Sequence, residues 1–261
     1  LPNYGVFDEK RYFTPGEASR VFSCGSFVFG VSICEDIWSD SDVPYQQARQ
    51  GAQCIININA SPYYAGKMAE RCGVIRKQVR SCRLPLAYVN LVGGQDELVF
   101  DGQSIIVDNK SGIVARAHGF REELLVADCA VAGKKYPSRH AITVAASVPE
   151  KKKPLLKRQC ASTMGRVPEV YEALVLGLRD YVLKNGFSKV VIGLSGGIDS
   201  SLVAVLAVDA LGKENVTGIF MPSRYSSQES RVDAETLAKN LGISFLEISI
   251  EPIYKAFLAS L

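Results

Sequence analysis

The sequence of 261 residues predicts an α/β fold built in two parts. Apolar, β-branched runs typical of buried strands alternate with stretches typical of helices, a pattern expected of layered α/β packing. Near Lys134 this pattern gives way to charged, proline-rich and small residues, and from Val167 a regular alternation of strand and helix begins. We therefore predict a first domain over residues 1–133, a linker over 134–166 and a second domain over 167–261.

The first part is predicted to contain strands, two helices and a hairpin. Its apolar runs are short and β-branched, as expected of buried strands, and the turn at residues 109–112 is typical of a hairpin. The expected strands are Phe27–Ile33, Cys54–Asn59, Leu86–Val92, Phe100–Asp108 and Ile113–Ala117, and the expected helices are 41–51 and 66–83.

The second part is predicted to alternate helix and strand with short connections. Its helices are rich in Leu, Ala and Val, and Gly212 closes one of them, as is common at helix ends. The expected helices are 170–185, 199–211 and 229–241, and the expected strands are 189–192, 216–221 and 244–250.

A glycine- and serine-rich loop, Gly193–Ser201, joins the first strand of this second part to the next helix. The first N–H groups of a helix lack partners and carry the positive end of its dipole, so such a loop is an anion site. Serine hydroxyls add donors, and Asp199 is suited to hold a divalent cation against a polyphosphate. We expect Gly197 to approach the phosphates closely, so that a β-carbon there would clash with the ligand or with the required backbone angles.

The loop differs from the common phosphate loop that ends in Gly-Lys-Ser/Thr, because no lysine falls between Lys189 and Lys213. Its Ser-Gly-Gly-Ile-Asp-Ser run, Ser195–Ser200, resembles the PP-loop of ATP pyrophosphatases. That resemblance implies cleavage of ATP between its α- and β-phosphates and adenylation of a substrate oxygen. A turn that uses glycine and serine for structural reasons alone is the alternative.

A second candidate site lies in the first part, where Cys34 directly follows a predicted strand and precedes Glu35. A thiolate on such a turn can attack a carbonyl if its neighbours lower the pKa of the thiol, and the Glu35 N–H is placed to hold the oxyanion. Taken alone, a cysteine after an apolar strand is more often an inert core residue. Neither His118 nor His140 lies in a pattern typical of a Cys-His pair.

Three segments, residues 1–9, 33–38 and 59–63, together resemble the nitrilase-type amidase superfamily. The resemblance implies an α-β-β-α sandwich and a catalytic triad of glutamate, lysine and cysteine. Only the cysteine, Cys34, is present here. The lysine is expected just before Leu1 and the glutamate farther upstream, so we expect the sequence to be truncated there and again after Leu261, where the second domain is incomplete.

A nitrilase-type domain followed by a PP-loop domain resembles the glutamine-dependent NAD synthetases, and residues 221–243 resemble the same family. The predicted fold is thus a partial nitrilase-like sandwich followed by the first part of a doubly wound, parallel-sheet PP-loop domain. The resemblance implies ATP-dependent amidation of nicotinic acid adenine dinucleotide to NAD (EC 6.3.5.1), with ammonia from glutamine hydrolysed at Cys34. It also implies ATP and Mg²⁺ at the Gly193–Ser200 loop.

The resemblance assigns roles residue by residue. Cys34 and Ser195 are expected to be catalytic, and Asp199 is expected to bind the metal. The expected glutamine-binding residues are Tyr4, Glu35, Trp38, Ser61 and Lys67. The expected ATP-binding residues are Gly193, Leu194, Ser195, Gly196, Gly197, Ile198, Asp199, Ser200 and Met221. Core packing is the alternative for Tyr4, Trp38 and Met221, and a solvated helix start is the alternative for Lys67.

Composition limits the remaining classes of function. A net charge of +3 is too small to indicate nucleic-acid binding, and Lys151–Lys153 between prolines is predicted to be a solvated linker. No apolar run is long enough to span a membrane. Seven cysteines without a C-x-x-C pair favour neither a disulfide framework nor a zinc site, and so favour the reducing cytoplasm. We expect small-molecule substrates and a homo-oligomer.

Two other functions fit the same sequence. One is a stand-alone nitrilase-type amidase with an appended, regulatory nucleotide-binding module. The other is a non-catalytic scaffold that has lost the triad.

Overall fold

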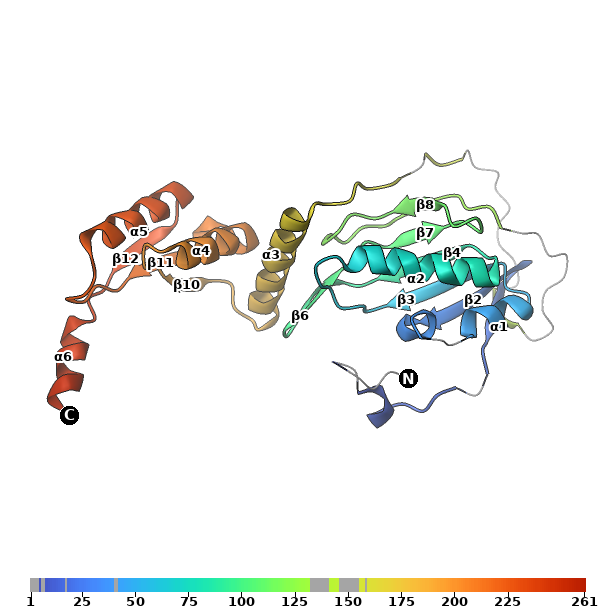
Figure 1. Ribbon diagram of the computed structural model, residues 1–261, viewed down its shortest axis with the longest axis horizontal. Helices are drawn as coiled ribbons and strands as arrows, with labels where there is room; N and C mark the ends of the chain where they lie inside the picture. Colours follow the sequence, from blue (N-terminus) through green and yellow to red (C-terminus); the bar gives the residue numbers. More distant parts are fainter. Residues whose placement is uncertain are drawn as a thin grey trace. The chain divides into compact units, whose positions relative to one another are not determined.

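The computed structural model describes residues 5, 8–16, 18–39, 42–131, 141–145, 155–157 and 159–261. The chain forms two compact units. The first comprises Leu1–Val92 and Phe100–Arg166, and the second comprises Gly93–Val99 and Val167–Leu261. Both are of the α/β class (Figure 1), so the predicted fold class is confirmed.

The first unit is organised around a seven-stranded mixed sheet with the order β8-β7-β4-β3-β2-β1-β9. Its central strands β2, β3 and β4 are parallel. Strand β1 is antiparallel to β2, β7 is antiparallel to β4, and β8 is antiparallel to β7. The strands are β1 (Val21–Cys24), β2 (Phe27–Ile33), β3 (Cys54–Asn59), β4 (Leu86–Asn90), β7 (Ile105–Val107), β8 (Ile113–Arg116) and β9 (Ile142–Ala145).

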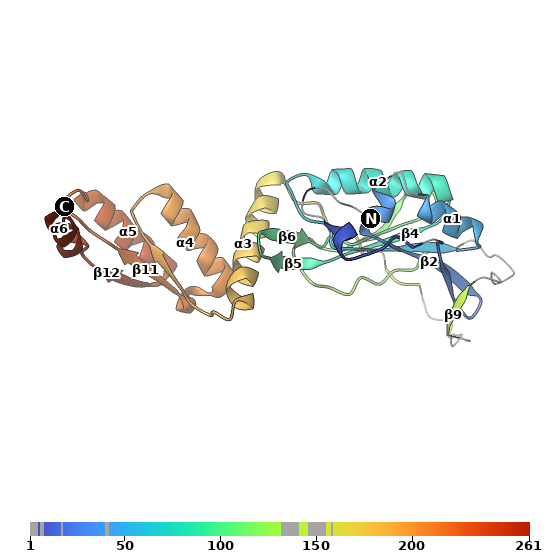
Figure 2. The same cartoon turned by 90° about the horizontal axis from the view of Figure 1, so that it is seen from below.

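One face of this sheet is covered by helices α1 (Val43–Arg49) and α2 (Lys67–Cys82), which lie together above it in Figure 2. Side chains alternate along a strand, so every second residue points into this layer. The resulting core is formed by apolar residues of the strands and of α2, among them Val28, Ile55, Ile75 and Leu86.

The other face carries apolar side chains that the described residues leave uncovered. Ile33, Ile58 and Val89 lie side by side in the registers of β2, β3 and β4, and they are 69%, 51% and 47% exposed. The described part of the chain therefore provides one sheet and one helical layer of the predicted sandwich.

Three features of residues 1–166 differ from the sequence prediction, and the first is β1, which is not among the expected strands. Leu98–Asp101 forms β6, which pairs with β5 (Val92–Gln95) rather than continuing into the strand that pairs with β8. Ile142–Ala145, within the predicted linker, forms β9 and pairs in parallel with β1. Ile142, Thr143 and Val144 individually favour a strand, but β9 depends on hydrogen bonds to a strand more than 100 residues earlier, which local sequence cannot reveal.

The second unit contains a three-stranded parallel sheet, β10-β11-β12. Its core joins Leu194, Phe220 and small residues of the two covering helices, including Ala204 and Ala234. The elements are α3 (Arg166–Lys184), β10 (Val190–Gly193), α4 (Ile198–Leu211), β11 (Val216–Phe220), α5 (Gln228–Leu241), β12 (Ser244–Glu247) and α6 (Glu251–Ala259). Across both units, the described residues also form short 3₁₀ turns at Glu9–Arg11, Cys34–Ile37 and Lys213–Asn215.

Candidate functional site

The first candidate site lies where the three central strands of the first unit end. Ile33 pairs with Ile58 and Asn59 pairs with Asn90, so β2, β3 and β4 end at the same edge. Cys34 follows β2 directly, and Ala60 and Ser61 follow β3. Ligands of α/β proteins bind at this carboxyl edge of parallel strands, which makes the edge a candidate active site.

Cys34 lies on a strained turn. Its backbone has a φ of 37°, a left-handed conformation that is uncommon for a residue with a β-carbon. The 3₁₀ turn Cys34–Ile37 begins there, and Asp36 Oδ2 accepts a hydrogen bond from the Ile33 N–H at 2.8 Å. Non-glycine residues held in such conformations cluster at functional sites, because the surrounding structure must stabilise them.

The surroundings of the Cys34 thiol have opposing effects on its pKa. Burial raises the pKa, and the carboxylates of Glu35 and Asp36 raise it further, whereas a hydrogen bond from the Ala60 backbone and the charge of Lys67 lower it. The net shift is upward. The resting group is therefore a thiol, and nucleophilic attack requires a base to remove its proton.

Lys67 begins α2 and points into the site rather than into solvent, because its side chain is only 14% exposed. Its Nζ lies 4.1 Å from the ring centroid of Trp38 and 4.7 Å from that of Tyr64, and it pairs with Glu70 at 3.8 Å. Burial and the nearby Arg71 lower the pKa of Lys67, while Cys34 and Glu35 oppose that shift. The site thus holds a partly desolvated cation beside the thiol.

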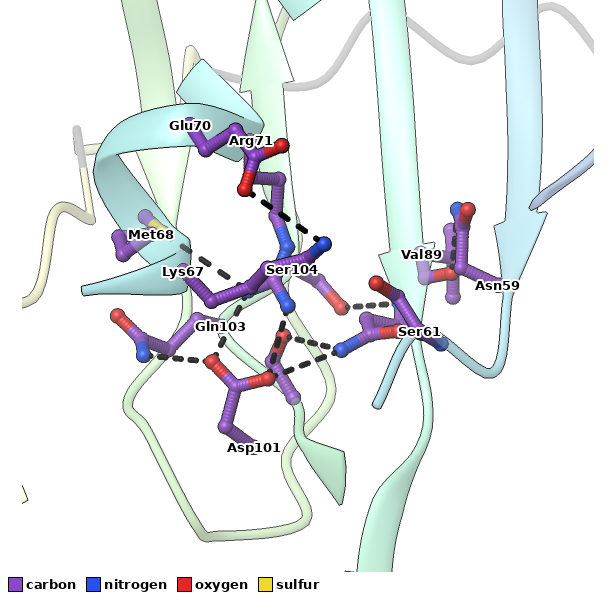
Figure 3. Close-up of polar contacts among 12 residues, drawn as sticks. Asn59, Ser61, Lys67, Met68, Glu70, Arg71, Val89, Asp101, Gln103 and Ser104 are labelled. Atoms are coloured by element: carbon purple, nitrogen blue, oxygen red, sulfur yellow. Dashed lines mark hydrogen bonds and ion pairs between the residues drawn. The ribbon is translucent and has the colours of Figure 1, made fainter. Parts of the chain in front are cut away.

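Behind these residues lies a buried polar network (Figure 3). Arg71 binds Asp101 through two hydrogen bonds of 2.9 and 2.8 Å, and both side chains are fully buried. Asp101 also accepts from Asn90 Nδ2 at 3.3 Å and from Gln103 Nε2 at 2.8 Å. Asn90 Oδ1 in turn accepts the main-chain N–H of Ser61 at 3.0 Å. The network therefore connects α2 and the end of β6 to the turn that follows β3.

The second candidate site is the loop between β10 and α4 in the second unit. Ser195 Oγ accepts from the Gly197 N–H at 3.2 Å and lies 3.0 Å from Ser200 Oγ. Ser200 and Ser201 donate to the Gly197 carbonyl at 3.0 and 2.8 Å. The serine hydroxyls thus fix the shape of the loop, while Gly197 stands at the N-cap of α4 without a side-chain cap.

Gly196 is the glycine that the loop conformation requires. Its φ is 79°, and a β-carbon there would lie 2.6 Å from the carbonyl oxygen and 2.8 Å from the Cα of Ser230. Gly197 has a φ of −87°, which any residue adopts, and a β-carbon there would meet only Ser195 Oγ at 3.3 Å. The expectation that the backbone angles require glycine at Gly197 is therefore wrong, because the left-handed step and the close contact with α5 fall one residue earlier.

A cavity of about 340 Å³ lies beside the loop within the second unit. It is lined by Gly193, Leu194, Ser195, Phe220, Met221, Tyr225, Ser226, Ser227 and Ser230. Phe220 is buried in the core, whereas Met221 is half exposed and lines the cavity. Glycine, hydroxyl and apolar groups side by side fit a ligand with a phosphate part and a flat apolar part.

Asp199 lies in the first turn of α4 and is exposed. Its carboxylate fits a cation held between the protein and a bound polyphosphate, because Mg²⁺ is commonly bound by one or two carboxylates together with substrate phosphates. Among the residues that the structure describes, no group of three or more histidine, cysteine or acidic side chains has the arrangement of a metal centre. The described residues also contain no helix long and apolar enough to cross a membrane.

The structure brings most of the predicted glutamine-site residues together. Cys34, Glu35, Trp38 and Lys67 surround one edge of the first unit's sheet, and Tyr4 lies outside the described residues. Ser61 is adjacent but only 3% exposed, and its N–H is bound to Asn90, so a substrate contact would have to use its hydroxyl. Glutamine binding by these residues stays a prediction.

The predicted ATP-site residues also lie together, around one loop and one cavity. Leu194 differs from the others because its side chain is part of the hydrophobic core. Only its main chain is therefore suited to contact a ligand. Ile198 and Asp199 are exposed at the start of α4.

Sequence reasoning missed Tyr64, Arg71, Asn90 and Asp101. Arg71 lies four residues after Lys67 and so on the same face of the expected helix, a spacing that could have drawn attention to it. Asn90 and Asp101 carried a weaker signal, since each is a polar residue at the end of an apolar run. Their contact across 11 residues of sequence is a tertiary feature.

Comparison with known proteins finds a matching family model for each part of the chain. Residues 1–135 match the family model described as carbon-nitrogen hydrolase, and residues 170–261 match the one described as NAD synthase. A glutamine-dependent NAD(+) synthetase of Aquifex aeolicus is 47% identical over 98% of this chain and 47% of the relative's length. A second, of Thermotoga maritima, is 44% identical over 100% of this chain and 48% of the relative. The chain thus spans about half the length of the curated relatives it matches.

A solved structure gives the same result for the fold. The glutamine-dependent NAD+ synthetase from Acinetobacter baumannii, in complex with adenosine diphosphate, matches 100% of this chain and 46% of its own, with 37% identity and a TM-score of 0.80. The match of residues 1–135 covers more than half of the chain. The chain therefore belongs to the carbon-nitrogen hydrolase family, and its residues 170–261 are similar to the NAD synthase family.

Proposed function

We propose that the protein is a glutamine-dependent NAD synthetase, which amidates nicotinic acid adenine dinucleotide to NAD at the expense of ATP. The observation that carries this proposal is the presence of two chemically different sites on one chain. One has a thiol on a strained strand-end turn, and the other has a phosphate-type loop without a lysine. Relatives named as glutamine-dependent NAD(+) synthetases, alike over nearly the whole chain, support it.

In the first step, Cys34 attacks the γ-amide carbon of glutamine. A base removes the thiol proton, the C–N bond breaks as that nitrogen takes up a proton, and ammonia leaves. Water then hydrolyses the thioester to glutamate and restores the thiol. The ammonium of Lys67 is suited to bind the α-carboxylate of glutamine, and Trp38 and Tyr64 restrict that cation to one position.

In the second step, the loop binds ATP through main-chain N–H groups and the hydroxyls of Ser195 and Ser200. The carboxylate of the dinucleotide displaces pyrophosphate to become an adenylate, and ammonia displaces AMP to give the amide. Asp199 would hold Mg²⁺, which neutralises phosphate charge when bound. Met221 lines the cavity beside the loop, and we expect it to cover the adenine ring. We also propose that the protein is located in the cytoplasm and forms a homo-oligomer.

The test uses the intact protein with ATP, the dinucleotide and either glutamine or an ammonium salt. We expect NAD, detected by its reduction with alcohol dehydrogenase, from both nitrogen sources, together with AMP and pyrophosphate. ADP and phosphate as products would contradict the assignment of the loop. A rate of glutamine hydrolysis that does not depend on ATP or the dinucleotide would indicate an amidase with a regulatory module. The absence of any turnover would indicate a scaffold.

A further inference from the structure

The buried pair of Arg71 and Asp101 is unexpected as a stabilising element. Both side chains are fully buried, and removing two charges from water costs free energy that their attraction only partly offsets. Two apolar residues of similar volume are often equally stable or better. The contacts of this pair therefore call for another explanation.

Every group that faces Asp101 in the network is a donor. The two terminal nitrogens of Arg71, Nη1 and Nη2, donate to it, as do the side-chain amides of Asn90 and Gln103. A carboxylate has acceptors only, so it satisfies all four bonds. Arg71 supplies the opposite charge that pairs with this buried carboxylate.

The bond from Asn90 to Asp101 fixes the orientation of the Asn90 carboxamide. With Nδ2 directed to Asp101 and to the Gly102 carbonyl, Oδ1 must face the other way, toward the Ser61 N–H. A flipped carboxamide would set its NH₂ against that N–H and leave two donors facing each other. Asp101 thereby determines which atom of Asn90 meets the turn after β3.

That turn is part of the environment of the nucleophile. Ala60, the residue before Ser61, follows β3 as Cys34 follows β2, and the two strands pair up to Ile33 and Ile58. The backbone of Ala60 is thereby close enough to Cys34 to lower the pKa of its thiol. A shift of the Ser61 N–H is passed to the Ala60 N–H, because the two groups belong to consecutive peptide planes that meet at the Ala60 Cα. A displacement of about 1 Å at reacting groups can cost on the order of 100-fold in rate.

We propose that Arg71 and Asp101 are positioning residues, which act through Asn90 to hold the Ala60–Ser61 turn against the Cys34 thiol. The effect on glutamine hydrolysis rests on the proposed function of this site. The effect on the thiol itself does not.

The test compares three variants of the intact protein, Arg71→Met, Asp101→Leu and the double variant that carries both. Each single variant leaves one buried charge or its partners unpaired, so we expect a lower unfolding temperature and reduced glutamine hydrolysis. The double variant removes both charges and should regain most of the unfolding temperature. If the pair positions the turn, the kcat for glutamine hydrolysis of the double variant should stay reduced, on the order of 100-fold.

A second readout requires no substrate. The rate at which iodoacetamide alkylates Cys34, followed by mass spectrometry of its peptide across a pH series, reports the pKa of the thiol. Loss of the Ala60 hydrogen bond should move this profile to higher pH in the double variant. Synthesis from an ammonium salt should stay unchanged in that variant, because it does not use the thiol.

The matched control is Gln53→Met, in the same unit. Gln53 is also buried and accepts the Val28 N–H at 2.9 Å, away from the network. It should lower the unfolding temperature without moving the alkylation profile.

Recovery of kcat in step with the unfolding temperature in the double variant would overturn the proposal, as would an alkylation profile unchanged from the wild type. If the double variant does not fold, Gln103→Met decides, because it removes one bond to Asp101 and keeps the ion pair. It should move the profile in the same direction by a smaller amount, and an unmoved profile would then refute the proposal. A wild type that does not hydrolyse glutamine would instead refute the proposed function, and the alkylation profile would still test the positioning.

Discussion

The two candidate sites are constructed in opposite ways. The Cys34 site is formed by side chains from several elements and lies against a fully buried ion pair. The Gly193–Ser201 loop is formed by consecutive residues, is largely exposed, and depends on main-chain conformation and hydroxyl groups. A site made of side chains in a low-dielectric setting is sensitive to charge, whereas a site made of backbone is sensitive to the volume and angles of its glycines.

The largest expected effects separate the two sites completely. Cys34→Ala in the intact protein should abolish NAD formation from glutamine, because no thioester can form, but should preserve formation from an ammonium salt. Asp199→Ala should suppress both, since it removes the metal ligand of the shared adenylation step. Assays with each nitrogen source measure this. A folded Cys34→Ala protein that loses both activities would show that Cys34 is not a dedicated glutaminase nucleophile.

The next effect tests the claim that the loop depends on main-chain geometry. Gly196→Ala places a β-carbon 2.6 Å from the Ser230 carbonyl oxygen at a φ of 79°, so it should destabilise the fold by about 1–3 kcal/mol and weaken ATP binding. Thermal unfolding and calorimetric titration with ATP measure the two quantities.

Gly197→Ala is the matched control for that variant. Its φ is compatible with alanine, so the unfolding temperature should hardly change. A loss of ATP affinity in this variant would therefore come from a clash between the added β-carbon and the bound phosphates, as expected if Gly197 approaches them closely. Equal destabilisation by the two variants would contradict the distinction drawn between them.

A smaller effect tests the claim that charge controls the first site. Lys67→Met should raise the KM for glutamine by roughly 10-fold to 100-fold, because a hydrogen bond to a charged group contributes about 1.5–3 kcal/mol. Lys67 lowers the pKa of the Cys34 thiol, so its removal should raise that pKa and shift alkylation to higher pH. Lys110→Met, at an exposed turn of the same unit, is the control and should change neither quantity.

The smallest expected effect concerns Ser195, which the family resemblance marks as catalytic. Ser195→Ala removes bonds to the Gly197 N–H and to Ser200, each contributing about 1 kcal/mol, so kcat/KM for ATP should fall by less than about 30-fold. Ser201→Ala removes the bond from the Ser201 hydroxyl to the Gly197 carbonyl and should have less effect. A loss of 1000-fold in Ser195→Ala would mean that its hydroxyl contacts the transferred group directly.

The sequence alone predicted those helices and strands whose apolar pattern lies entirely within the element. The helix expected over 66–83 spans Lys67–Cys82, and the strand expected over 27–33 is β2. The Gly193–Ser201 loop of the second unit was also predicted from the sequence, because its glycines and serines are consecutive residues. Cys34 alone was ambiguous, and only the family resemblance of its neighbours made it a candidate nucleophile.

Tertiary structure decided the features that depend on distant residues. Parallel pairing places Asn59 beside Asn90, and it brings Cys34 to the edge where Lys67 begins α2. Asp101, the partner of Arg71, lies 30 residues away in the sequence. The strand that pairs with Ile142–Ala145 lies about 120 residues away. Local periodicity reports which face of an element is apolar, since burial follows the repeat of the backbone. It carries no information about which buried polar groups satisfy one another, because that depends on how separate elements pack.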